Sequence, residues 1–213
     1  MPDPVPLARP VLEGAPVVVV IDAQRDWELA PGRAGISEPA AVAPAIAGIG
    51  RVLDAARAAS TPVVFCQEVH RSSGIDYGRE LDHGAPLRCV EGEAATALLP
   101  ELCLHDDDLV VVKRRCSAFF GTELALLLRS LGATTLVLVG GLTDVCVHAT
   151  FLDAFQHGFV VRVVEDACVG SSIRRHEAAL DAMAFLHHGV RRSSDDVAGA
   201  LSSPRAGSPV AAG

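Results

Sequence analysis

The sequence predicts an α/β fold in which a doubly wound, mostly parallel sheet lies between two layers of helices, giving three layers. Segment 17–21 is apolar at every position and segment 135–139 at every position after Thr135, which is typical of strands buried on both faces of a sheet. Helix-like segments alternate with these strands, and helical crossovers are the economical way to join parallel strands. Sheets of this kind place their chemistry just beyond the carboxyl ends of the strands.

Each expected element is bounded by residues that stop it. The alanine-rich helix 39–60 ends before Pro62, and Gly132, Gly158 and Gly189 follow three further helices, where glycine commonly ends a helix. The expected strands are 17–21, 62–67, 109–113, 135–139, 159–164 and a short 190–193, and the expected helices are 39–60, 122–131, 146–157 and 171–188.

The ends of the chain differ in composition from its middle. Residues 1–15 hold four of the thirteen prolines and are predicted to form an extended arm. Residues 202–213 are rich in Ser, Pro, Gly and Ala and are predicted to be a flexible tail. One domain is expected between them, over residues 16–201. Within it, residues 71–107 are irregular and long for a loop, so we expect a lid or substrate loop there.

Composition and charge exclude several classes of function. The net charge of −8 argues against a nucleic-acid or anionic-membrane surface. The longest apolar runs have strand length, so no membrane span is expected. The first residues lack the charged and apolar regions of a signal peptide, which predicts a cytoplasmic location. A small molecule is the expected partner.

The six cysteines stand at wide, irregular spacings, without a C-x-x-C pair. A zinc knuckle, a thioredoxin-like motif and a disulfide framework are therefore not expected. Most of these cysteines are expected to be small buried hydrophobic residues. A functional role for any one of them needs a separate argument.

Three chemically active side chains follow three different strands. Asp22 follows the first strand, Lys113 ends the third, and Cys146 comes after a turn beyond the fourth. Parallel strands bring these positions to one rim of the sheet, which gives a nucleophile-plus-base site. A thiol at the positive end of a helix is favoured as the thiolate.

Each group has an expected role in such a site. Asp22 takes the thiol proton and later gives it to a leaving nitrogen, while Lys113 holds Asp22 and favours the thiolate electrostatically. The backbone N–H groups of Leu142 and Cys146 receive the developing oxyanion.

Structural interpretations exist beside these catalytic ones. Asp22 alone could cap the next segment, Lys113 could be a solvated charge and Cys146 a core residue. His70 also lies past a strand end and is a rival base, because Cys–His pairs are a common nucleophile arrangement. The coincidence of three groups at strand ends favours catalysis by Asp22, Lys113 and Cys146.

Three motifs carry a family resemblance. They are VVIDAQRDW (19–27), VVKRRCSAFFGTEL (111–124) and GGLTDVCVHAT (140–150). With them, the chain resembles the isochorismatase-like cysteine hydrolases from about residue 16 to about residue 193. The resemblance implies the same doubly wound sheet, an Asp22–Lys113–Cys146 triad and a non-proline cis peptide bond between Gly141 and Leu142.

The resemblance also narrows the activity. Enzymes that split the vinyl ether of isochorismate lack the cysteine that this chain has. Nicotinamidases carry an Asp-x-His metal motif where this chain reads Gln67-Glu-Val-His70, so neither a metal nor a cofactor is expected. Residues 88–93 and 113–122 are similar to the biuret, ureidoacrylate and N-carbamoylsarcosine hydrolases. Cys116 departs from the tyrosine that those relatives often have.

The expected function is therefore hydrolysis of a C–N bond in a small amide or ureido compound through a thioester, with release of ammonia or an amine. Family members are commonly dimers or tetramers, so a homo-oligomer is expected. Alternatives are a non-catalytic binding or assembly role, isochorismate-type ether hydrolysis, and redox chemistry by a reactive thiol. The redox alternative lacks an obvious resolving cysteine nearby in sequence.

Arginine and aromatic residues supply candidate substrate contacts. An arginine would suit a substrate carboxylate. Surface charge for the arginines and core packing for the aromatic residues are the competing interpretations. The candidates are Trp27, Gln67, Arg71, Arg79, Phe119 and Phe120.

Overall fold

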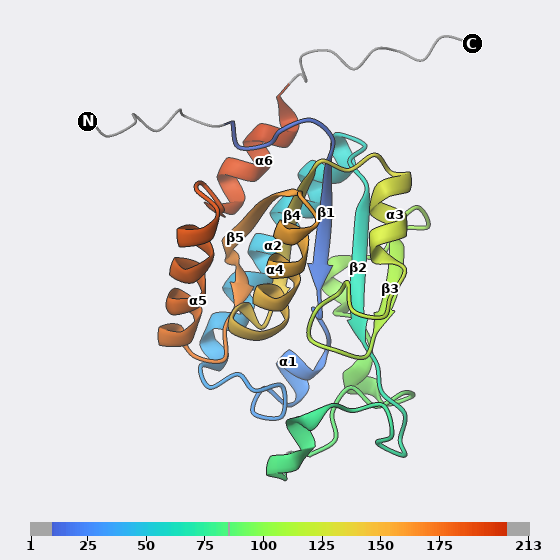
Figure 1. Cartoon of the computed structure of the whole chain (residues 1–213). Coiled ribbons are helices and arrows are strands. Elements are labelled where there is room, and N and C mark those ends of the chain that lie inside the picture. Colours follow the sequence, from blue (N-terminus) through green and yellow to red (C-terminus); the bar gives the residue numbers. More distant parts are fainter. Residues whose placement is uncertain (1–9, 85, 204–213) are drawn as a thin grey trace.

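The protein is a three-layer α/β structure built on a six-stranded parallel sheet (Figure 1). In the computed structural model, residues 10–84 and 86–203 are described, so most of the predicted arm and tail lies outside the described residues. The strand order is β3-β2-β1-β4-β5-β6, which is doubly wound, as predicted. The strands are β1 (Pro16–Ile21), β2 (Val63–Glu68), β3 (Leu109–Lys113), β4 (Thr135–Gly141), β5 (Val160–Val169) and β6 (Arg191–Arg192).

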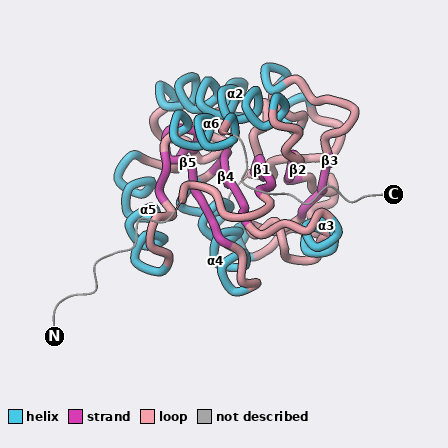
Figure 2. The backbone as a smooth tube through the Cα atoms, turned by 90° about the horizontal axis from the view of Figure 1, so that it is seen from above, coloured by secondary structure: helices cyan, strands magenta, loops and turns pink. Residues whose placement is uncertain are grey.

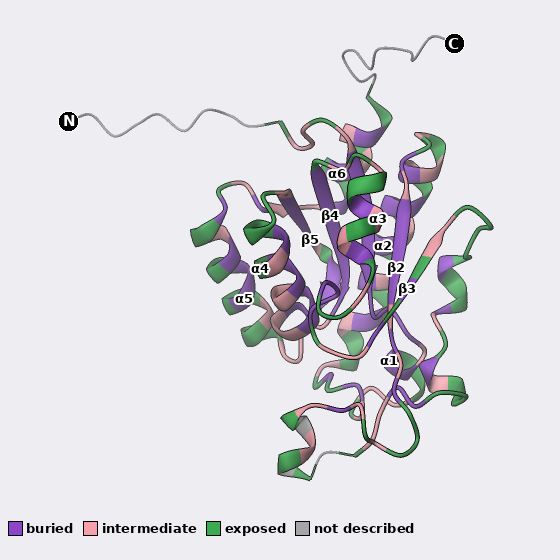
Figure 3. Ribbon diagram, turned by 45° about the vertical axis from the view of Figure 1, so that its right-hand side comes forward, coloured by how far each residue is buried: buried purple, intermediate pink, exposed green. Residues whose placement is uncertain are grey.

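Two helical layers cover the sheet (Figure 2). On one face, α2 (Val42–Ala58) and α6 (Ser194–Ser202) pack over side chains such as Val18 and Val20 of β1. On the other face lie α3 (Leu124–Ser130), α4 (His148–Gln156) and α5 (Ile173–Leu186), which pack over the alternate side chains of the same strand. Every residue of β1 is buried, which explains its continuous apolar sequence (Figure 3).

The stretch Pro39–Ala58 is long and apolar enough to cross a membrane by length and composition alone. In the structure, the side of α2 that carries Ile49, Val52 and Leu53 is buried in the core, where it packs against one face of the sheet. This is the arrangement of an amphipathic core helix.

The sequence prediction did not include the four-residue helix α1 (Asp26–Leu29). Three further elements differ from it. The helix expected at 146–157 starts as a π-helical turn, Thr143–Val147, and becomes α-helical only at His148. The strand expected at 159–164 continues to Val169, because the polar pair Glu165 and Asp166 does not end it.

The third difference is α6, which was not expected. It starts with a capping box in which Ser193 and Asp196 bond each other's backbone N–H groups. The carboxylate of Asp166 also accepts a hydrogen bond of 2.7 Å from the N–H of Ser194, so a residue of β5 helps to cap this helix. The S-x-x-D spacing was the sequence signal for this start.

The first part of the long segment 71–107 lies beyond the carboxyl ends of the strands, where Figure 1 shows it in green below the sheet. Bridges Gln24–Leu98 and His70–Val90 attach this part to the rim of the sheet, so it forms one wall of the space at the strand ends. The last part returns to the amino end of β2, where His105 lies near Val63. The segment contains three short 3-10 turns, at Arg79–His83, Ala94–Thr96 and Pro100–Leu102.

Candidate active site

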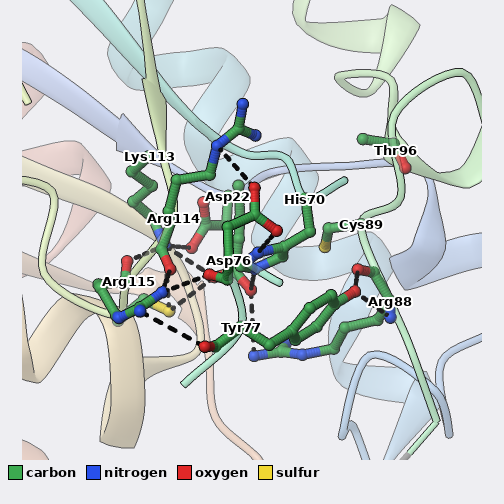
Figure 4. A network of polar contacts seen from close by, with 12 residues as sticks. Asp22, His70, Asp76, Tyr77, Arg88, Cys89, Thr96, Lys113, Arg114 and Arg115 are labelled. Carbon is green, nitrogen blue, oxygen red and sulfur yellow. Dashed lines mark hydrogen bonds and ion pairs between the residues drawn. The ribbon is translucent and has the colours of Figure 1, made fainter. Parts of the chain in front are cut away.

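The ammonium group of Lys113 is the centre of the site (Figure 4). Its Nζ lies 2.7 Å from Oδ2 of Asp22, 2.8 Å from Oε2 of Glu68 and 3.5 Å from Sγ of Cys146. Lys113 is completely buried, so a charge there requires such partners. Burial opposes the charge, but Asp22, Cys146 and Glu68 outweigh it and raise the pKa of Lys113 well above its ordinary value. The three predicted residues are therefore brought together.

Cys146 is placed by the end of β4 and the π-helical turn that follows. Gly140 has φ +115°, and a Cβ there would lie 2.0 Å from the carbonyl oxygen of Ile21, so only glycine lets β4 approach β1 this closely. The Gly141–Leu142 peptide bond is cis, which confirms that expectation. The turn leaves Cys146 buried and pointing at Lys113.

Asp22 turns the chain at the end of β1. Its backbone has φ +47°, and its N–H donates to the carbonyl of Cys66 at 2.8 Å. One of its carboxylate oxygens lies within 4.8 Å of Sγ of Cys146. Burial raises the pKa of Asp22 to about 6, with the charge of Glu68 adding to burial and Lys113 opposing it. A carboxyl group with this pKa is suited to accept and return a proton near neutral pH.

Glu68 is a fourth member of the cluster that the sequence analysis did not select. Its backbone exchanges two hydrogen bonds with the side chain of Gln24, of 2.9 and 3.0 Å. Burial raises its pKa, but Lys113, His70 and Arg88 together hold the pKa well below its ordinary value. The sequence could have indicated Glu68, because it ends strand β2 as Lys113 ends strand β3. The two residues are register partners in the sheet.

His70 supports Glu68 and does not contact the thiol in the described structure. Its Nε2 lies 3.2 Å from Oε1 of Glu68 and its Nδ1 lies 3.5 Å from Oδ1 of Asp76. Its ring stacks on Tyr77 with centroids 3.8 Å apart. The geometry therefore favours Asp22 over His70 as the base for Cys146.

One group of donor atoms has the spacing of a metal site. Ligand atoms of Asp22, Glu68 and Cys146 lie within 4.8 Å of one another. The ammonium of Lys113 contacts all three, so this cluster already holds a cation. The donor set fits an internal ammonium better than a second positive ion.

A small pocket opens beside the cluster. Its cavity volume is about 20 Å³, close to the room that one water molecule needs. Arg88 and Cys89 enter it from the long segment, and the guanidinium of Arg88 lies 3.3 Å from Oε1 of Glu68. The other lining residues are Asp22, Gln24, Asp26, Trp27, Ala34, Glu68, Gly141, Leu142, Val145 and Cys146.

Of the candidate substrate contacts, Trp27 lines this pocket. Gln67 points instead to the carbonyl of Thr96, because alternate residues of β2 face opposite sides of the sheet. The side chains of Arg71 and Arg79 are 61% and 94% exposed and pair with nearby aspartates. These three therefore lie outside the pocket, and the surface-charge interpretation fits both arginines.

The two phenylalanines also lie outside the pocket. Phe119 packs in the core against His157 and Phe159, with ring centroids 5.1 and 6.3 Å away. Phe120 is 66% exposed. The pocket residues that sequence reasoning missed include Glu68, Asp26 and Arg88, the last of which was noted only as part of a similar segment.

Cys116 lies on the chain next to a partner of Lys113, because Lys113 donates both to the carbonyl of Arg115 and to Sγ of Cys146. The side chain of Cys146 lowers the pKa of Cys116 to about 6, while burial opposes the shift and Lys113 favours it. The side chain of Cys116, followed by burial, raises the pKa of Cys146, against the effect of Lys113.

This fold and site define a class of protein: a doubly wound α/β protein with a thiol, a carboxylate and an ammonium at the strand ends. Residues 16–194 match the isochorismatase domain. The chain belongs to the isochorismatase-like hydrolase family, which confirms the resemblance.

Individual relatives agree with this assignment. The chain is 31% identical over 182 residues to the ureidoacrylate amidohydrolase RutB of Yersinia enterocolitica serotype O:8 / biotype 1B, covering 77% of this chain and 78% of that protein. It is similar to the structure of an isochorismatase family protein from Desulfovibrio vulgaris subsp. vulgaris str. Hildenborough, with TM-score 0.77 and 27% identity over 90% of this chain and 100% of that one. The fold also matches a cysteine hydrolase from Pseudomonas syringae pv. phaseolicola 1448A, with TM-score 0.79 and 22% identity over 92% and 98% of the two chains.

Proposed function

We propose that this protein is a cysteine amidohydrolase that cleaves the C–N bond of a small ureido or amide compound. The observation that carries the proposal is the contact of one buried ammonium, Lys113, with both the thiol of Cys146 and the carboxylate of Asp22. Acyl transfer needs a nucleophile and a base close together, and here one cation contacts both groups.

The proposed reaction has two halves. Cys146 loses its proton to Asp22, and its sulfur attacks the substrate carbonyl. The backbone N–H groups of Leu142 and Cys146 stabilise the oxyanion. The intermediate then expels ammonia or an amine, which takes the proton from Asp22, and a thioester remains on Cys146. In the second half Asp22 removes a proton from water, hydroxide attacks the thioester, and the acid leaves while the sulfur is released.

Lys113 stays charged in both halves. Its ammonium favours the thiolate over the thiol and fixes the Asp22 carboxylate beside the sulfur. A buried, fixed charge acts more strongly than an exposed one because water does not screen it.

A ureido compound with an acidic group is the substrate class that the pocket supports best. The relative RutB carries the name ureidoacrylate amidohydrolase. The guanidinium of Arg88 in the pocket wall would bind a carboxylate, and the buried carboxylate of Asp26 would accept hydrogen bonds from ureido N–H groups. Since the cavity is about 20 Å³, we propose that the part of segment 71–107 that carries Arg88 and Cys89 moves outward to admit the substrate.

The test is release of ammonia from a panel of ureido acids, ureas and simple amides. Cys146→Ala should abolish turnover with the fold retained by circular dichroism, while Cys103→Ala, at an exposed thiol outside the pocket, should retain it. Quenched wild-type reactions should show the acyl mass on Cys146. Turnover that survives Cys146→Ala would refute the mechanism, and a complete lack of turnover across the panel would favour the binding role.

A further inference from the structure

The phenol of Tyr77 holds both backbone polar groups of Arg88 (Figure 4). The N–H of Arg88 donates to the phenol oxygen at 2.7 Å, and the phenol O–H donates to the carbonyl of the same residue. Arg88 lies in an irregular part of segment 71–107, where no strand or helix fixes its backbone. The phenol therefore sets the direction in which the side chain of Arg88 leaves the backbone.

Tyr77 is itself fixed from two sides. Its ring stacks on the buried ring of His70, with centroids 3.8 Å apart and 21° between the planes. Its carbonyl accepts a hydrogen bond of 3.4 Å from the guanidinium of Arg115. The carbonyl of Arg115 accepts in turn from Lys113 at 2.9 Å. Residues just past the ends of β2 and β3 thus hold the phenol in place.

These contacts close into a ring around Glu68. Nε2 of His70 lies 3.2 Å from Oε1 of Glu68, and the guanidinium of Arg88 lies 3.3 Å from the same oxygen. The phenol of Tyr77 completes the ring, because it stacks on His70 and holds the backbone of Arg88. Arg88 is therefore held at both ends, by Glu68 at its guanidinium and by Tyr77 at its backbone. A group held in this way is preorganised for binding.

We propose that Tyr77 is a positioning residue that sets the charge selectivity of the pocket. Its phenol keeps the guanidinium of Arg88 where an anionic group beside Cys146 pairs with it, since both residues line the same pocket. The inference rests on the proposed function for the identity of that anion, an acidic ureido substrate. Without the phenol the backbone of Arg88 is released, and the guanidinium no longer offsets the carboxyl groups of the pocket.

Iodoacetate and iodoacetamide are suitable probes, because both alkylate a thiolate and they differ in charge. In each reaction the sulfur of Cys146 displaces iodide from a CH₂ carbon, so an S–C bond forms while the C–I bond breaks. The ratio of the two rate constants at Cys146, followed by peptide mass spectrometry, measures the preference for the anion. Forming the ratio removes the effects of thiol pKa and of access to the sulfur, and the measurement needs no turnover. The exposed Cys103 supplies the reference ratio in every sample.

Three variants carry the test. Arg88→Met should lower the iodoacetate-to-iodoacetamide ratio at Cys146 about tenfold or more, because it removes a charge-assisted hydrogen bond to the carboxylate. Tyr77→Phe keeps a ring stacked on His70 and removes only the hydroxyl, and it should lower the ratio about three- to tenfold. The double variant should give the ratio of Arg88→Met alone, because Tyr77 acts through Arg88.

Thr122→Val is the matched control. The hydroxyl of Thr122 also donates to one backbone carbonyl, that of Ala118, and accepts from one N–H, that of Leu124, but it lies outside the pocket. Its removal should leave the ratio at Cys146 unchanged.

A second variant covers a failure to fold. Tyr77→His keeps an aromatic ring over His70 but is too short to reach Arg88, so it repeats the test if Tyr77→Phe is unfolded by circular dichroism.

Each other outcome has one meaning. A wild-type ratio in Tyr77→Phe, or additive effects in the double variant, would overturn the proposal. An unchanged ratio in Arg88→Met would also overturn it, because no anion would then pair with Arg88 beside Cys146. Failure of both reagents at wild-type Cys146 would refute the thiolate nucleophile and both proposals together. A lack of turnover on ureido acids and amides, with the ratios as expected, would refute the proposed function and leave the role of Tyr77 standing.

Discussion

The carboxylate of Glu68 lies 2.8 Å from the ammonium of Lys113, almost as close as the 2.7 Å that separates Lys113 from Asp22. One buried cation therefore holds two buried carboxylates. His70 and Arg88 bind the other side of Glu68, which stays ionised, while Asp22 has no second cation in the described structure and its pKa rises to about 6. The two carboxylates thus have different tasks: Glu68 supplies fixed charge and Asp22 moves the proton.

The first prediction is an acid limb in the pH dependence of kcat/KM near pH 6. Asp22 must be ionised to accept the thiol proton, and burial raises its pKa to about 6. Activity should therefore fall about tenfold per pH unit below that value. Burial also raises the pKa of Asp26 to about 6, so Asp26→Asn is the control. It should keep the limb, whereas Asp22→Asn should lose roughly 10²–10⁴-fold in rate and the limb with it. If the acid limb disappeared in Asp26→Asn, the limb would belong to Asp26 and the prediction for Asp22 would be wrong.

The second prediction is that Glu68→Gln moves this limb to lower pH. The negative charge of Glu68 raises the pKa of Asp22, and Lys113 lowers it. Removal of that charge takes away the repulsion and leaves Lys113 to pair with Asp22 alone, so both effects lower the pKa. The pH profile of kcat/KM for Glu68→Gln and for the exposed control Glu91→Gln measures the shift. An unchanged or raised limb would show that Glu68 does not act on Asp22.

The third prediction concerns stability. Lys113→Met should cost about 3–5 kcal/mol in the free energy of unfolding, because it leaves two buried carboxylates without their shared cation. Urea denaturation at pH 7 measures the loss. Arg71→Met is the matched control, since the Arg71 side chain is 61% exposed and an exposed ion pair contributes about 0–1 kcal/mol. Equal stability of the two variants would mean that the buried cluster does not depend on the ammonium.

The fourth prediction tests recognition by Arg88. If its guanidinium binds a substrate carboxylate, Arg88→Met should raise KM for an acidic ureido substrate more than for a neutral analogue of similar size. Arg79→Met, with a side chain that is 94% exposed, should change neither value. Equal losses for the acidic and the neutral substrate would instead indicate that Arg88 acts by holding Glu68 at 3.3 Å.

The sequence was sufficient for the order of the six strands and of helices α2 to α5, and for the convergence of Asp22, Lys113 and Cys146. Apolar strands and strand-end positions follow from local sequence and from the geometry of parallel sheets. The end of β5 was mispredicted because Glu165 and Asp166 are polar, yet their partners Arg191 and Ser194 lie more than twenty residues away. These distant partners satisfy the polar side chains, so the strand continues through them. Nothing in the neighbouring sequence indicates that such partners exist.

The site shows the same division. Glu68 was within reach of sequence reasoning, because it faces the same side of the sheet as Lys113. The contact of Lys113 with the carbonyl of Arg115 and the entry of Arg88 into the pocket depend on irregular segments, whose paths have no periodicity to predict them. The candidate substrate contacts that lie outside the pocket, such as Phe120 and Arg71, were chosen by residue type alone.

The last prediction tests the turn that delivers Cys146. Gly140→Ala would place a Cβ 2.0 Å from the carbonyl oxygen of Ile21, at a φ of +115° that L-residues rarely adopt. Because β1 is the buried centre of the sheet, its backbone cannot shift away, and we expect a loss of more than about 3 kcal/mol in the free energy of unfolding. Gly50→Ala is the matched control, since nothing lies within 4 Å of its Cβ and the residue is inside α2. It should gain about 0.5–1 kcal/mol from helix propensity. Thermal and urea unfolding of both variants should thus shift in opposite directions, and a Gly140→Ala protein as stable as the wild type would show that β4 and β1 do not approach this closely.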